Sequence, residues 1–248
     1  MSFTSNDNGR LCNQIFRNFA VSKIAEKHDL HVDYSNIDLI NQLGINFYIG
    51  NNTYNETIIL NDNNYFDILF GPKIYCNINA NKSYFQTKEI SNMIYNHLQN
   101  DIIKQHIINS NQFKDRYNNN NDLFIHIRLT DVKHLNPGIN YYLNTISKIN
   151  KLTDINNIYI SSDDINNELI KTIIIKNPTI ILLNHDEIKT IQFGSTCKNI
   201  ILSHGSFSAI IGYLAFNSQV YYPAYEENKI WYGDIFSING WNNISLSN

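Results

Sequence analysis

The stretch LFIHIRLTD (residues 123–131) decides how the chain folds, because an apolar run leads directly into charged residues. On a β-strand, successive side chains point to opposite faces, so Leu123, Ile125 and Ile127 share one face while His126 and Arg128 share the other. Arg128 falls at the carboxyl end of this strand, and Asp131 lies in the turn beyond it. Open α/β sheets bind ligands at that edge. We therefore expect a cation, an imidazole and a carboxylate to meet there.

Downstream of this stretch, the apolar residues alternate between strand-like and helix-like spacing. This alternation predicts a parallel sheet covered by helices on both faces. The last strand is expected to stop at Pro223. The expected strands are 157–162, 179–183, 199–203 and 219–222, and the expected helices are 139–149, 164–175, 186–196 and 207–216.

Upstream of the same stretch, the pattern is less regular. A helix is expected over 15–24 with Asn13 as its N-cap, and residues 88–113 are expected to be helical throughout. Residues 36–87 show no clear period, because Asn, Gly and aromatic residues interrupt it. The polar run 118–121 is the expected linker between domains.

The length of the chain and the position of the linker fit two lobes that share a ligand cleft. Its 248 residues suffice for one large domain or two small ones. Because the linker falls near the middle, we expect an N-terminal α/β lobe of residues 1–117 and a C-terminal lobe of residues 122–248. Ligands are expected outside the carboxyl ends of the strands.

Charge and composition exclude several classes of function. The net charge is −3 and no segment carries a block of Lys or Arg, so nucleic acid is not an expected partner. The three cysteines form no CxxC pair, which favours a reducing compartment over a disulfide framework. The apolar runs fall short of the roughly 20 residues that span a bilayer, and the first residues have no apolar run of the signal-peptide kind, so neither a membrane span nor a signal peptide is expected. We expect a cytoplasmic protein of unspecified oligomeric state.

A second candidate site lies in the stretch IILSHGSFS (residues 200–208), where a buried strand stops and an apolar helix begins. Gly205 permits a sharp turn, and the small residues after it open the helix. A helix start offers unpaired N–H groups and the positive end of a dipole, which suit a phosphate. Ordinary N-capping by Ser206 is the alternative interpretation. The stretch GRLCNQ (residues 9–14) raises a weaker possibility of the same kind.

A third candidate is Asp163, which follows the strand 157–162. It either caps the next helix, as Asp164 could, or accepts hydrogen bonds from a nucleoside. Several motifs are absent from the sequence: GxGxxG, GxxxxGK[ST], HExxH and any Asp-x-Asp triplet. Dinucleotide cofactors, P-loop sites and the usual manganese clamp of sugar transferases are therefore not expected.

Taken together, these segments resemble the alpha-1,2-fucosyltransferase family (glycosyltransferase family 11) and its GDP-fucose-using relatives. GRLCNQIF (residues 9–16) is similar to the opening motif G-x-L-G-N-Q-[LM]-F of that family, and HIRLTD (126–131) matches its H-x-R-x-x-D signature. The Tyr pair at 141–142, the run SDD (162–164) and the run SFS (206–208) follow in the order of the family.

The resemblance implies a GT-B-like fold of two Rossmann-like lobes, with the donor on the C-terminal lobe and the acceptor on the N-terminal lobe. It implies inverting, metal-independent transfer of fucose from GDP-fucose to a glycan hydroxyl, without a cofactor. Arg128 would bind the donor diphosphate with His126 beside it on the nucleotide, and Asp131 is the candidate general base. The other residues implied in donor binding are Asn13, Gln14, Asp163, Gly205, Ser206, Phe207 and Ser208.

The sequence also departs from the family, for example by Cys12 in place of a Gly and Leu129 in place of a second basic residue. Two alternatives therefore stay open. One is a transferase of the same fold that uses another nucleotide-deoxysugar, and the other is a non-catalytic module that binds nucleotide-sugars or glycans.

Overall fold

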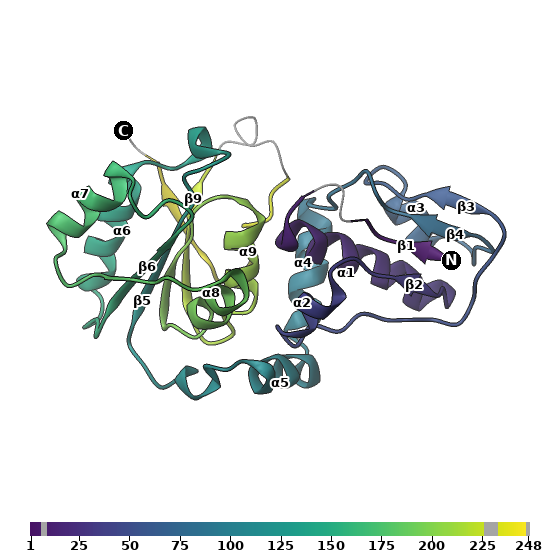
Figure 1. Cartoon of the computed structure of the whole chain (residues 1–248), viewed down its shortest axis with the longest axis horizontal. Coiled ribbons are helices and arrows are strands. Elements are labelled where there is room, and N and C mark those ends of the chain that lie inside the picture. Colours follow the sequence, from purple (N-terminus) through teal and green to yellow (C-terminus); the bar gives the residue numbers. More distant parts are fainter. Residues whose placement is uncertain (6–8, 226–232, 247–248) are drawn as a thin grey trace.

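The computed structural model describes residues 1–5, 9–225 and 233–246, and it has two lobes side by side (Figure 1). Each lobe is built on its own sheet, and all strand pairs of both sheets are parallel. The expected α/β, GT-B-like fold of two Rossmann-like lobes is thereby confirmed. The first sheet uses residues 2–79 and the second uses residues 123–245. The boundary between the lobes at 117–122 stays a prediction.

The first sheet has four strands in the order β2-β1-β4-β3. Residues 36–87, which had no clear period, supply half of its strands. β1 and β4 are the two central strands and lie side by side, so the segments that follow them emerge at neighbouring points. The elements of this lobe are β1 (Ser2–Phe3), α1 (Leu11–His28), β2 (Val32–Asp33), α2 (Ile37–Asn41), β3 (Thr57–Ile59), α3 (Tyr65–Phe70), β4 (Asn77–Asn79) and α4 (Lys88–Leu98).

The second sheet has six strands in the order β10-β9-β8-β5-β6-β7. Successive strands run outward from β5 on one side and from β8 on the other, so the topological switch point lies between β5 and β8. A crevice at the carboxyl ends of these two strands is the standard ligand site of such sheets. The strands are β5 (Leu123–Ile127), β6 (Ile158–Ser162), β7 (Ile181–Leu182), β8 (Asn199–Ile201), β9 (Gln219–Ala224) and β10 (Asn242–Ser245).

Helices cover both faces of the second sheet, as expected. α8 (Glu187–Gly194) and α9 (Gly205–Tyr213) lie on the face turned toward the first lobe, and α6 (Ile139–Asn150) and α7 (Glu168–Lys176) on the other (Figure 1). The alternation along β5 separates two apolar cores, because Phe124 belongs to the core on the α8–α9 side and its neighbours Leu123 and Ile125 belong to the other.

The two lobes share one of these cores. Residues of α1, α9 and α8 belong to the same buried apolar cluster, in which Phe16 and Ile210 are fully buried. The rings of Phe16 on α1 and Tyr213 on α9 lie 5.7 Å apart. The boundary between the lobes is therefore sealed by packed apolar side chains next to the cleft.

The connection between the lobes is fixed to α8. α5 (Asp101–Ser110) leads from the first lobe, and the 3₁₀ turn Lys114–Arg116 follows it. The side-chain amide of Asn111 donates to the backbone oxygen of Gln192 at 2.9 Å, and the amide of Gln192 donates to the backbone oxygen of Gln42 at 2.8 Å. A second 3₁₀ turn, Lys133–Leu135, lies beyond β5.

Three features of the structure differ from the expected elements. Residues 88–113 are not one helix, because the side chain of Asn100 caps a new one by accepting from the backbone of Ile102 and Ile103. The strand expected to stop at Pro223 continues to Ala224, because residues 221–224 pair with β10. β10 was not expected at all. Within the described part of the chain, no helix is long and apolar enough to cross a bilayer.

Candidate functional site

A cavity of about 770 Å³ opens between the lobes at the carboxyl ends of the strands. This volume lies within the range of small-molecule sites. The first lobe contributes the segments that follow β1 and β4, and the second contributes those that follow β5, β6, β7 and β8. The switch point of the second sheet therefore faces the cavity. The lining residues are Gly9, Arg10, Leu11, Cys12, Asn13, Tyr84, Gln86, His126, Arg128, Asp131, Val132, Ser161, Ser162, Asp163, His185, Glu187, Thr190, His204, Gly205, Ser206 and Phe207.

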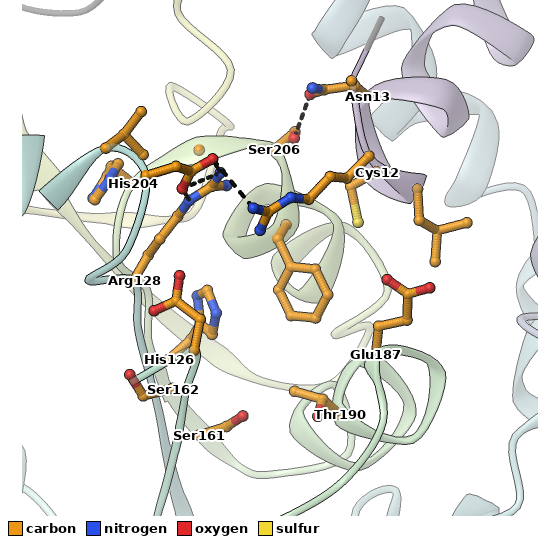
Figure 2. Close-up of a pocket in the computed structure, with 18 of the residues that line it drawn as sticks. Cys12, Asn13, His126, Arg128, Ser161, Ser162, Glu187, Thr190, His204 and Ser206 are labelled. Atoms are coloured by element: carbon orange, nitrogen blue, oxygen red, sulfur yellow. Dashed lines mark hydrogen bonds and ion pairs between the residues drawn. The ribbon is translucent and has the colours of Figure 1, made fainter. Parts of the chain in front are cut away.

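Arg128 and Asp131 form a close ion pair at the end of β5 (Figure 2). The Arg128 guanidinium donates from Nε to Oδ1 of Asp131 at 3.1 Å, and from Nη2 to Oδ1 at 2.9 Å and to Oδ2 at 2.8 Å. This pairing is the main cause that lowers the pKa of Asp131, with a further contribution from Arg10. Asp131 therefore stays ionised and is a weak proton acceptor at neutral pH.

The start of α9 lies against the same guanidinium. Gly205 has a φ of +85°, and a Cβ at this position would lie 3.1 Å from Nη1 of Arg128. Glycine is required here because other residues rarely adopt this φ and because a side chain would press on the guanidinium. An arginine and a helix amino terminus thus adjoin at the switch point, the combination that suits a phosphate.

Ser206 does not cap α9. The N-cap is His204, without a side-chain hydrogen bond, and the Ser206 hydroxyl instead donates to Oδ1 of Asn13 at 2.6 Å. Asn13 also accepts from Nε2 of Gln86 at 2.8 Å. Asn13 is not the N-cap of α1, which begins two residues earlier after Arg10. Its amide joins the two lobes at the rim of the cavity (Figure 2).

His126 lines the cavity from β5, and its Nδ1 lies 2.6 Å from the hydroxyl oxygen of Ser208. Its ring centroid is 5.0 Å from that of Phe207. Burial lowers the pKa of His126 to about 3 and that of His204 to about 4, so both rings are neutral at pH 7. Ser208 is fully buried and does not line the cavity, which makes it a support for His126.

The remaining two predicted residues have different places. Asp163 lines the cavity, but its carboxylate accepts from the backbone N–H groups of Leu129 at 2.7 Å and Thr130 at 3.3 Å and from the Thr130 hydroxyl at 2.6 Å. It fixes the turn after β5 and caps no helix, since Asn167 is the N-cap of α7. Gln14 is buried outside the cavity and donates to the backbone oxygen of Gly9 at 3.0 Å.

Sequence reasoning missed several lining residues that come from distant segments. Tyr84 and Gln86 follow β4, in the region without a clear period. Glu187 and Thr190 lie on the first turns of α8, across the cavity from Arg128 (Figure 2). The helix expected at 186–196 could have revealed this pair, because helices that follow the strands of a parallel sheet begin at its ligand-binding edge.

The described residues contain no group of three or more His, Cys, Asp or Glu side chains arranged to hold a metal ion. The metal-independent reaction stays a prediction.

Comparison with known proteins gives one kind of match. No model of a protein family matches the chain, and no curated protein matches it. Among solved structures, one match is a mutant of Arabidopsis thaliana FUT1 in complex with GDP. The two chains are 12% identical with a TM-score of 0.49, and the match covers 92% of this chain and 71% of that one. The site is therefore interpreted from its own geometry, and membership of glycosyltransferase family 11 stays a prediction.

Proposed function

We propose that this protein is an inverting, metal-independent glycosyltransferase that moves fucose from GDP-fucose to a glycan hydroxyl. The observation that carries the proposal is the contact of Arg128 with the amino terminus of α9, at the switch point of a sheet and inside a cavity between two lobes. The order of the sequence motifs, including the H-x-R-x-x-D signature, supports a GDP-sugar as the donor.

The proposed reaction breaks the bond between the anomeric carbon and the diphosphate oxygen. The acceptor hydroxyl attacks from the opposite side, a new carbon–oxygen bond forms, and GDP leaves with the electron pair of the broken bond. Negative charge grows on the diphosphate during this step. Arg128 and the positive end of α9 face the place where that charge develops, and preorganised groups of this kind stabilise a transition state.

The proton of the attacking hydroxyl needs an acceptor. Asp131 was the candidate from sequence, but the guanidinium of Arg128 lowers its pKa and makes it a weak base. Glu187 also lines the cavity, and the described residues give it no hydrogen bond or ion pair. The departing diphosphate can also take the proton. We propose Glu187 and the diphosphate as alternatives to Asp131.

In this proposal the two lobes bind different parts of the substrates. The donor nucleotide lies along the second lobe, near His126 and Phe207, while the sugar and the acceptor face Asn13 and Gln86 of the first lobe. The contact between Asn13 and Ser206 then lies where the donor sugar and the diphosphate meet.

A donor screen tests the proposal. Melting temperatures of the full chain are measured with GDP, UDP and dTDP, because a ligand that binds the native state raises the melting temperature. We expect GDP to give the largest rise, and labelled GDP-fucose to be transferred to a galactoside in the presence of EDTA. A larger rise with UDP or dTDP would identify a different donor. Binding of GDP without transfer or hydrolysis of the sugar would indicate a non-catalytic module.

A further inference from the structure

A second arginine reaches the diphosphate site from the opposite lobe. Arg10 is the N-cap residue of α1, and it lines the cavity together with Asp131. Its Nη2 lies 3.6 Å from Oδ2 of Asp131. One carboxylate therefore stands between two guanidinium groups, one supplied by each lobe.

The Asp131 carboxylate interacts more closely with Arg128 than with Arg10. Arg128 engages both oxygens of Asp131 at 2.8 to 3.1 Å and is largely shielded, with its side chain 16% exposed. Arg10 reaches only Oδ2, at the longer distance, and its side chain is 70% exposed. An exposed ion pair of this kind contributes little to stability. Folding alone therefore gives no strong reason for Arg10 to extend into the cavity.

A diphosphate has enough acceptor oxygens to form close ion pairs with both guanidinium groups at once. It offers more acceptor oxygens and more negative charge than one carboxylate, and arginine pairs with phosphate oxygens through two parallel hydrogen bonds. Asp131 sits on a turn with its side chain 43% exposed, so it can move into water when another anion takes over its partners.

We propose that Arg10 is a second diphosphate-binding residue, and that Asp131 holds Arg10 and Arg128 at the site until the diphosphate replaces it. The inference rests on the proposed function, because it needs a diphosphate as the ligand. It assigns to the first lobe a direct contact with the leaving group. It also gives Asp131 the role of a competing internal anion in place of a base.

The test measures binding by calorimetry on the full chain, with GDP and with inorganic pyrophosphate. We expect Arg10→Gln to weaken both ligands by about tenfold, the scale of one lost hydrogen bond to a charged group. Pyrophosphate has no base or sugar, so a loss with both ligands locates the contact on the diphosphate. Asp131→Asn should tighten both ligands, because no carboxylate competes for the guanidinium groups.

Lys133→Gln is the matched control, since it removes one exposed positive charge near the site from a residue that does not line the cavity. If Arg10→Gln binds both ligands as tightly as this control, the inference is wrong. It is also wrong if Asp131→Asn binds them more weakly than the wild type. Arg10→Lys, which keeps the charge, replaces Arg10→Gln if the latter does not fold.

Failure of the inference and failure of the proposed function give different results. Binding of GDP by the wild type that is lost in Arg128→Gln but kept in Arg10→Gln leaves the proposed function intact and refutes the inference. A wild-type chain that binds no nucleoside diphosphate at all refutes both.

Discussion

Replacing Arg128 with glutamine removes the positive charge at the end of β5 and keeps a polar side chain of similar reach. Because the Arg128 side chain is only 16% exposed, its charge is screened less than a charge in open water. Loss of one key transition-state donor lowers turnover by about 10² to 10³, which corresponds to about 2.7 to 4 kcal/mol. We expect a loss of at least 10² in kcat/KM for transfer from GDP-fucose.

The same substitution should leave the fold intact. The carboxylate that loses its partner, Asp131, is 43% exposed and can be hydrated. An ion pair with such an exposed member contributes about 1 kcal/mol or less to stability. The melting temperature of Arg128→Gln should therefore stay close to that of the wild type, so that lost activity reports on chemistry and binding.

The assay follows the release of labelled fucose from GDP-fucose, both to water and to lactose as the acceptor. Arg128→Lys should give an intermediate rate, because it keeps the charge and loses the planar pair of donors. Lys133→Gln should transfer at the wild-type rate. Near-normal transfer by Arg128→Gln would remove Arg128 from its assigned role and, with it, the mechanism.

Two further predictions concern stability and the start of α9. The pKa values of His126 and His204 are about 3 and 4 in the folded chain, so the unfolded chain binds more protons than the folded chain below pH 6.5. The free energy of unfolding should therefore fall as the pH is lowered below 6.5, by about 1.4 kcal/mol per pH unit for each histidine. Urea unfolding at pH 7 and pH 5.5 checks this, and an unchanged midpoint would contradict it. Gly205→Ala should destabilise the chain by about 1–2 kcal/mol through its φ of +85°. It should also weaken GDP binding by displacing Arg128, and wild-type GDP affinity would show that the glycine contact is not used.

The sequence predicts best those parts of the fold for which the residue pattern of one short segment is sufficient. In the strand 123–127 successive side chains point to opposite faces, and the structure places the two faces in different cores. The same alternation placed His126 and Arg128 on the cavity. The strands and helices after it also follow the expected order as far as β9.

The parts that sequence reasoning missed depend on contacts between distant segments. Asn13 was expected at the cleft and lines the cavity, but its expected role as a helix cap was wrong, since its partners Gln86 and Ser206 lie 73 and 193 residues away. Asp163 looked like a cap for a similar reason, although it fixes the turn after β5. The region 36–87 has short elements of three to six residues, too short to show a period.

The apolar contact between α1 and α9 limits how the two lobes could be recombined with those of other proteins. A hybrid that took its first lobe from another protein of this fold would bring a new partner for Tyr213, which is fully buried in the native chain. Unless the incoming helix carried a bulky apolar residue in the place of Phe16, the apolar face of α9 would be exposed to water and would promote aggregation. A hybrid of two such chains should therefore take α1 and α9 from the same parent protein.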